Sequence, residues 1–146
     1  MVTEGSSFSR LFTVAEANLL LPHIRPKVSR VRDALISLKD EIAAAAREGQ
    51  VAPWDPRVAK KLDERGVAVR LAQEVGRLTE EIHAHGCLVN GPEEGLVDFP
   101  CLLGSEIVFL CWKLGEERVC HWHRVSEGFA GRRPLLDRRV GVESVN

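Results

Sequence analysis

Apolar residues recur every three or four positions in the first half of the chain, and this period constrains its fold class. From Val28 onward the spacing is 3, 4, 3, 4 and 3, the heptad pattern of a helix that packs against another helix. The residues of this series are Val28, Val31, Leu35, Leu38, Ile42 and Ala45. A second series consists of Val67, Leu71, Val75, Leu78 and Ile82. We therefore expect two helices that form a long antiparallel hairpin over about residues 13–86.

Local signals mark where these helices begin and where they are disturbed. Thr13 and Glu16 have the spacing of a capping box, in which each side chain binds the backbone N–H of the other residue. Asp55 followed by Pro56 is typical of a cap and a first helical position. Pro22 and Pro26 each remove a backbone donor, so we expect a kink or a break near residues 20–26.

The second half of the chain has the alternation and the turn residues of β-strands. Three strands are expected, at residues 96–99, 106–114 and 118–125. The fold class predicted by the sequence is therefore α+β: a long antiparallel helical hairpin packed on a small antiparallel three-stranded sheet. We interpret residues 1–146 as a single domain, with the β-rich part at about 87–135 and a flexible tail at 136–146.

The last two expected strands contain the residues that could form a site, so their register matters. A turn centred on Glu116 and Glu117 pairs Leu114 with Val119, and counting outward places Trp112 opposite His121. This register puts both histidines of the His121-Trp122-His123 segment on the face that we expect to pack on the helices. It puts Cys111 and Cys120 on the other face, and without a neighbouring base we expect both thiols to be inert.

Composition limits the choice of partner and compartment. The chain has 20 basic and 21 acidic residues, so no global charge attracts nucleic acid or an anionic membrane. No apolar run approaches the roughly 20 residues of a membrane-spanning helix. The chain has four cysteines, and its first residues show no recognisable secretory pattern. Together these observations favour reduced thiols and a cytoplasmic location.

His121 and His123 are the sharpest candidates for chemistry. Residues i and i+2 of a strand project from the same face, a spacing that suits a divalent transition metal. Asp98 is the third ligand that we expect, and the other candidates are Glu116, His83 and His85. The alternative is that both histidines make ordinary hydrogen bonds on a half-buried face.

A glycine-rich basic loop, residues 128–134, is the second candidate. Arg132 and Arg133 follow two glycines there. Glycines let the backbone approach a bound anion closely, and guanidinium groups beside it suit a carboxylate or a phosphate. The alternative is a structural loop that covers the sheet and leaves its arginines in solvent.

Several segments together resemble an uncharacterised bacterial family, the domain-of-unknown-function family 2203. The segments are residues 12–18 (FTVAEAN) with Leu20, Leu21 and Pro22, residues 95–100 (GLVDFP), residues 110–116 (LCWKLGE), Trp122-His123 and residues 128–132 (GFAGR). The resemblance covers residues 12–135 and implies no activity. It draws attention to the polar members of these segments, which are Glu16, Asn18, Asp98, Glu116, His123 and Arg132. His121 lies outside the pattern, so the resemblance argues against a site with two histidines. It leaves open a site with His123 as the single histidine and Asp98 and Glu116 as its partners.

These observations lead to two hypotheses from different classes. The first is a non-catalytic cytoplasmic interaction or ligand-binding module, assembled as a homodimer through its helices, that binds a small anionic ligand. Its ligand-binding residues are Asp98, Trp112, Glu116, His123 and Arg132. The alternative is a metal-dependent, hydrolase-like enzyme in which Asp98, Glu116 and His123, with or without His121, hold a divalent ion that activates water. Arg132 would then hold an anionic group of the substrate. Nucleic-acid binding through Arg132, Arg133, Arg138 and Arg139 is a weaker third interpretation.

Overall fold

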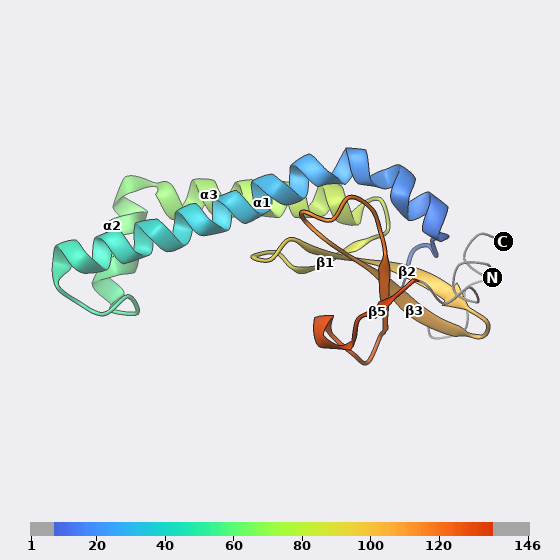
Figure 1. The fold of residues 1–146 in the computed structure, drawn as a ribbon. Coiled ribbons are helices and arrows are strands. Elements are labelled where there is room, and N and C mark those ends of the chain that lie inside the picture. Colours follow the sequence, from blue (N-terminus) through green and yellow to red (C-terminus); the bar gives the residue numbers. More distant parts are fainter. Residues whose placement is uncertain (1–7, 136–146) are drawn as a thin grey trace.

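The computed structural model describes residues 8–135. The predicted tail, with Arg138 and Arg139, lies outside the described residues. The helices are α1 (Val14–Gly49), α2 (Pro56–Arg65) and α3 (Val67–His83), with a short 3₁₀ helix, η1, at Phe129–Gly131. The strands are β1 (Leu88–Gly91), β2 (Leu96–Leu103), β3 (Glu106–Lys113), β4 (His121–Arg124) and β5 (Arg133–Pro134). The predicted α+β class is confirmed (Figure 1).

The longest helix, α1, begins at the predicted capping box. The Thr13 hydroxyl accepts from the Glu16 N–H at 3.0 Å, and a Glu16 carboxylate oxygen accepts from the Thr13 N–H at 2.8 Å. The helix then continues through Pro22 and Pro26, so a break there is wrong, although its axis turns in the blue segment (Figure 1). Burial explains the continuity, because Leu21, Ile24 and Val28 are held in the core across both prolines. None of the described helices is both long and apolar enough to cross a bilayer.

The expected second helix is two helices. Asp55 caps α2 as predicted, accepting at 2.9 Å from the Arg57 N–H. Gly66 then takes a left-handed conformation with φ of 70°, which ends α2 and starts α3. A glycine adopts this conformation without steric cost, so it divides a region where the apolar period alone predicted one helix.

Five antiparallel strands, in the order β1-β2-β3-β4-β5, form the sheet, so the prediction of three strands was too few. The two outermost strands, β1 and β5, are short and were missed. Helices α1 and α3 cover one face of the sheet, while η1 lies on the other side (Figure 1). The core between the helices and the sheet includes Ile24, Leu78, Phe99 and Trp112, each at most 1% exposed.

The pairing of β3 with β4 differs by one residue from the predicted register. Cys111 pairs with His121, and Leu110 pairs with Trp122. The connecting segment is a wide loop rather than a tight turn, because the Asn18 side chain on α1 accepts from the Val119 N–H at 2.8 Å. Shifting a strand by one residue moves every side chain to the opposite face. Trp122 therefore packs toward the helices, and both histidines lie on the face that carries Cys111.

The capping box makes a stability prediction. Thr13→Ala removes the oxygen that accepts from the Glu16 N–H, and should lower the free energy of unfolding by about 1 kcal/mol. Urea denaturation followed by circular dichroism measures this difference. Ser37→Ala, at an exposed position inside the same helix, is the matched control and should change stability by no more than about 0.5 kcal/mol. Equal effects of the two substitutions would contradict the capping role.

Candidate functional site

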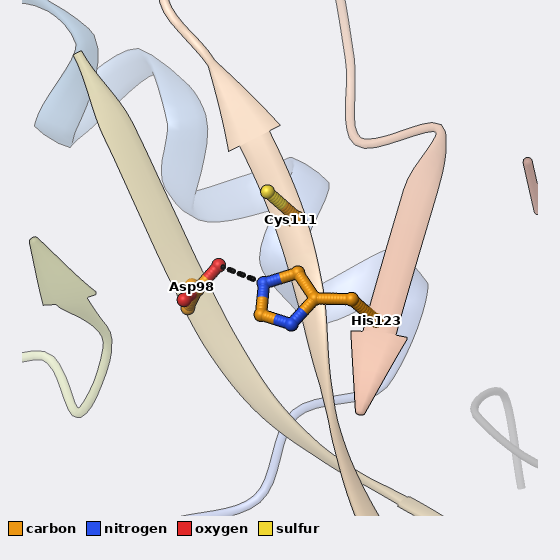
Figure 2. Close-up of side chains that lie close together, drawn as sticks. All are labelled: Asp98, Cys111 and His123. Carbon is orange, nitrogen blue, oxygen red and sulfur yellow. Dashed lines mark hydrogen bonds and ion pairs between the residues drawn. The ribbon is translucent and has the colours of Figure 1, made fainter. Parts of the chain in front are cut away.

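Three neighbouring strands bring Asp98, Cys111 and His123 together on the sheet face away from α1 and α3. Asp98 lies on β2, directly opposite Cys111 on β3, and His123 on β4 reaches across β3 toward Asp98 (Figure 2). One potential ligand atom from each residue lies within 4.8 Å of the other two. All three side chains are buried, and Asp98 and His123 are each only 2% exposed. Within the described part of the chain, this is the one group of three or more potential metal ligands.

The hydrogen bonds of His123 fix how its imidazole is used. Its Nδ1 lies 2.8 Å from the backbone carbonyl oxygen of Arg124, and its Nε2 lies 3.1 Å from Asp98 Oδ1. A carbonyl oxygen only accepts, so Nδ1 carries a hydrogen. Nε2 of the neutral ring is then a lone pair that faces a carboxylate oxygen. Two acceptors at this distance need a cation between them, either a proton or a metal ion.

Asp98 is held from its other side by β1. The side-chain amide of Asn90 donates to Asp98 Oδ2, which leaves Oδ1 for His123. The carboxylate is therefore oriented by an outer partner, as ligating carboxylates in metal sites commonly are.

Cys111 completes the group as a buried thiol. Burial, together with the neighbouring Asp98 carboxylate, raises its pKa to about 12, while Arg132 acts in the opposite direction. A thiol with so high a pKa is a poor nucleophile at neutral pH. A bound metal ion reverses this situation, because a coordinating thiol is deprotonated outright.

A cavity of about 260 Å³ opens beside the three residues. Its lining consists of Asn90, Leu96, Asp98, Cys111, His123, Glu127, Gly128 and Phe129. Glu127 is engaged by Arg133 through two contacts of 2.8 and 2.9 Å. The Arg133 guanidinium and the Arg124 N–H lower the pKa of Glu127 to about 2, so this carboxylate stays ionised.

The remaining predicted site residues lie elsewhere. Trp112 is fully buried on the helix-facing side of the sheet, where its indole N–H donates to the Glu116 carbonyl oxygen at 2.9 Å. The Glu116 carboxylate accepts from Arg132 at 2.6 Å, so the guanidinium already has an anionic partner. His121 Nδ1 lies 3.4 Å from the same carboxylate and is not in the group of three.

The other two histidines that were considered as ligands are also separate from the group. His83 Nε2 accepts at 3.0 Å from the Val89 N–H, and the His85 carbonyl accepts from Arg10. Both lie near the end of α3, where the His83 contact joins this helix to β1 and the His85 contact joins it to the segment before α1.

Cys111 is the member that the sequence analysis missed. The predicted register placed it on the face opposite to His123, so it was interpreted only as an inert thiol. Two features of the sequence point to Cys111. It lies one residue before Trp112 in β3, and the preceding strand contains Asp98. Correct pairing of these strands alone is sufficient to bring the three residues together.

Comparison with known proteins places the chain in a family. A family model described as an uncharacterized conserved protein, DUF2203, matches residues 10–135. The chain belongs to this family, in agreement with the resemblance of its motifs. No curated protein and no solved structure matches it.

Thiol reactivity tests the burial of the site. In metal-free native protein at pH 8, iodoacetamide should alkylate Cys120, the exposed cysteine, and leave Cys111 unmodified. With a pKa of about 12, only about one Cys111 thiol in ten thousand is ionised at this pH, and reactivity should rise as the pH is raised. Peptide mass spectrometry locates the modification, and Cys120→Ser provides the control. Equally fast labelling of Cys111 and Cys120 would contradict this arrangement.

Proposed function

We propose that this protein is a metal-binding module that holds one divalent transition metal ion at Asp98, Cys111 and His123. The observation that carries the proposal is the pair of acceptors in the buried site, His123 Nε2 and Asp98 Oδ1, which face each other at 3.1 Å. The Cys111 sulfur lies within 4.8 Å of the other two ligand atoms, so a cation between the acceptors would also be in reach of a thiolate.

The orientation of His123 supports a metal ligand rather than a purely structural histidine. Metal-binding histidines typically donate the hydrogen of one ring nitrogen to a carbonyl or a carboxylate and ligate through the other nitrogen. His123 has this arrangement, with Nδ1 at the Arg124 carbonyl and Nε2 in the site. Ligands of a tetrahedral zinc ion lie roughly 3.3 Å apart, given metal–nitrogen and metal–oxygen distances of about 2.0–2.2 Å. The observed 3.1 Å is close to this spacing.

The ligand types favour zinc or a similar ion. A thiolate and an imidazole suit Zn²⁺ and other borderline or soft ions, whereas Mg²⁺ and Ca²⁺ prefer oxygen ligands. One thiolate and one carboxylate together balance the two positive charges of the ion, which reduces the cost of burying it. Three protein ligands leave one tetrahedral position for another group, and the 260 Å³ cavity provides space beside the site.

We further propose that the open position serves binding rather than hydrolysis. An efficient general base has a pKa near the working pH. Glu127, the cavity carboxylate outside the ligand set, has a pKa of about 2 and is already engaged by Arg133. This environment is unfavourable for accepting a proton from a metal-bound water, which is the step that the hydrolase hypothesis requires.

We also propose that the protein acts in the cytoplasm. Cys87, Cys111 and Cys120 are free thiols. A reducing compartment keeps Cys111 available as a ligand, because oxidation would remove the thiolate from the site.

The metal proposal predicts which residues matter. Zinc titration by calorimetry should give one ion per chain for the wild-type protein, and Cys111→Ser, His123→Ala and Asp98→Asn should each weaken binding at least about tenfold. The matched control is His121→Ala. This residue is on the same strand and the same face as His123 but is not in the group of three. Unchanged zinc affinity in His123→Ala, or a loss in His121→Ala as large as in His123→Ala, would contradict the assignment.

The helices provide a separate proposal, a homodimer formed at the end of the hairpin that extends beyond the sheet (Figure 1). Trp54 in the loop before α2 is 85% exposed there. It borders an apolar groove of about 350 Å³, whose lining includes Leu38, Ile42, Val58, Leu62 and Ala68. An exposed aromatic side chain beside an apolar groove suits a twofold contact, in which each copy supplies both parts.

Self-association should therefore depend on Trp54. Sedimentation equilibrium should show a dimer for the wild-type protein, and Trp54→Glu should weaken dimerisation more than tenfold because it removes a large apolar surface. Leu19→Glu is the control, since Leu19 is 75% exposed at the other end of α1. A wild-type protein that remains monomeric at about 100 μM would contradict the dimer, and it would leave the metal site unaffected.

A further inference from the structure

Arg132 connects Cys111 with the loop that follows β3. One guanidinium nitrogen, Nη2, donates to the Cys111 carbonyl oxygen at 3.2 Å and to Glu116 Oε1 at 2.6 Å. The Arg132 side chain is 12% exposed, so both contacts are largely shielded from water. The planar guanidinium also lies over the Phe129 ring, with 4.7 Å between its central carbon and the ring centroid. The side chain is thus fixed from three directions.

Glu116 holds the other end of this connection. Its Oε1 accepts from the Lys113 N–H at 2.7 Å, and its backbone carbonyl accepts from the Trp112 indole at 2.9 Å. Together Arg132 and Glu116 bind the last residues of β3 on both sides of Trp112. The backbone of Cys111 is therefore set by this pair as well as by the sheet.

We propose that Arg132, held by Glu116, is a positioning residue of the metal site that fixes Cys111 and places a cation beside its thiolate. This inference rests on the proposed metal-binding function. A Cys111 thiolate beside the Asp98 carboxylate puts two anions in a buried site, and a fixed guanidinium offsets part of their repulsion.

A second observation agrees with this role. The Nε atom of Arg132 is buried and has no hydrogen-bond acceptor among the described residues. Buried donors without partners are rare in folded proteins, and each calls for an explanation. A thiolate at Cys111 has lone pairs that such a donor could use, whereas the protonated thiol is only a weak acceptor.

The chain provides a matched control in Arg133. This residue is adjacent to Arg132, also pairs with a glutamate, and also lies over an aromatic ring, in this case that of Trp122 at 4.9 Å. No hydrogen bond or ion pair joins Arg133 to Cys111 among the described residues. Loss of either arginine disturbs the loop, but only loss of Arg132 should affect the thiolate.

The experiment is a Co²⁺ titration of the wild-type protein, Arg132→Met, Arg132→Lys and Arg133→Met, with affinities measured by competition with a chelator. We expect Arg132→Met to weaken Co²⁺ binding about 10- to 100-fold, the usual effect of removing an outer partner of a metal ligand. Arg132→Lys, which keeps the charge but not the planar fork, should recover part of this loss. Arg133→Met should stay within about threefold of the wild type.

The thiolate-to-cobalt absorption band gives a readout that a structural role would not change. The band should persist in Arg132→Met, because Cys111 still ligates, but it should move to longer wavelength because the sulfur has lost a cationic neighbour. If Arg132→Met does not fold, Glu116→Gln provides the second variant, in which a neutral amide replaces the carboxylate that holds Arg132. It should weaken Co²⁺ binding several-fold and shift the band in the same direction.

Two results would overturn the positioning role. The first is wild-type affinity and band position in the Arg132→Met variant, or in Glu116→Gln where that variant replaces it. The second is an equal loss of affinity in Arg133→Met, which would assign the effect to the loop as a whole. A wild-type protein that binds no Co²⁺ would instead refute the metal site itself, so the two failures are distinguishable.

Discussion

The contact between His123 and Asp98 is the constraint on which the account of the site depends. It places a ring nitrogen and a carboxylate oxygen 3.1 Å apart, with both side chains 2% exposed. The other ring nitrogen, Nδ1, donates a hydrogen bond to the Arg124 carbonyl oxygen. The contact between His123 Nε2 and Asp98 therefore needs a cation to be favourable. We propose that this cation is a divalent metal ion, because the Cys111 sulfur lies within 4.8 Å of both ligand atoms.

The helices contribute to this site through the loop between β3 and β4. Asn18 on α1 accepts from the Val119 N–H, and Arg25 on the same helix donates to the Glu117 carbonyl at 2.9 Å. These two contacts hold the loop open, and the open loop sets the register that puts His123 on the same face as Cys111. Pro22 lies between the two residues and leaves the Asn18 carbonyl without its usual helical donor. The start of α1 therefore holds this loop through Asn18 and Arg25 and also packs in the core.

Local patterns in the sequence predicted much of the fold and part of the site. The capping box at Thr13, the cap at Asp55 and the α+β class follow from short-range rules, and the structure agrees with each. Asp98 and His123 were also selected as candidate ligands. Cys111 was not, because the register of β4 depends on a contact from Asn18 that is about 100 residues away in sequence. Such a contact leaves no periodic signal in the strands it positions.

The most direct test of the central claim is X-ray absorption spectroscopy of the zinc-loaded protein. A zinc ion at Asp98, Cys111 and His123 should have one sulfur ligand at about 2.3 Å and its remaining nitrogen or oxygen ligands at about 2.0–2.2 Å. The sulfur contribution should disappear in Cys111→Ser. A shell of nitrogen and oxygen alone in the wild-type protein would contradict the site, because it would place the ion away from Cys111.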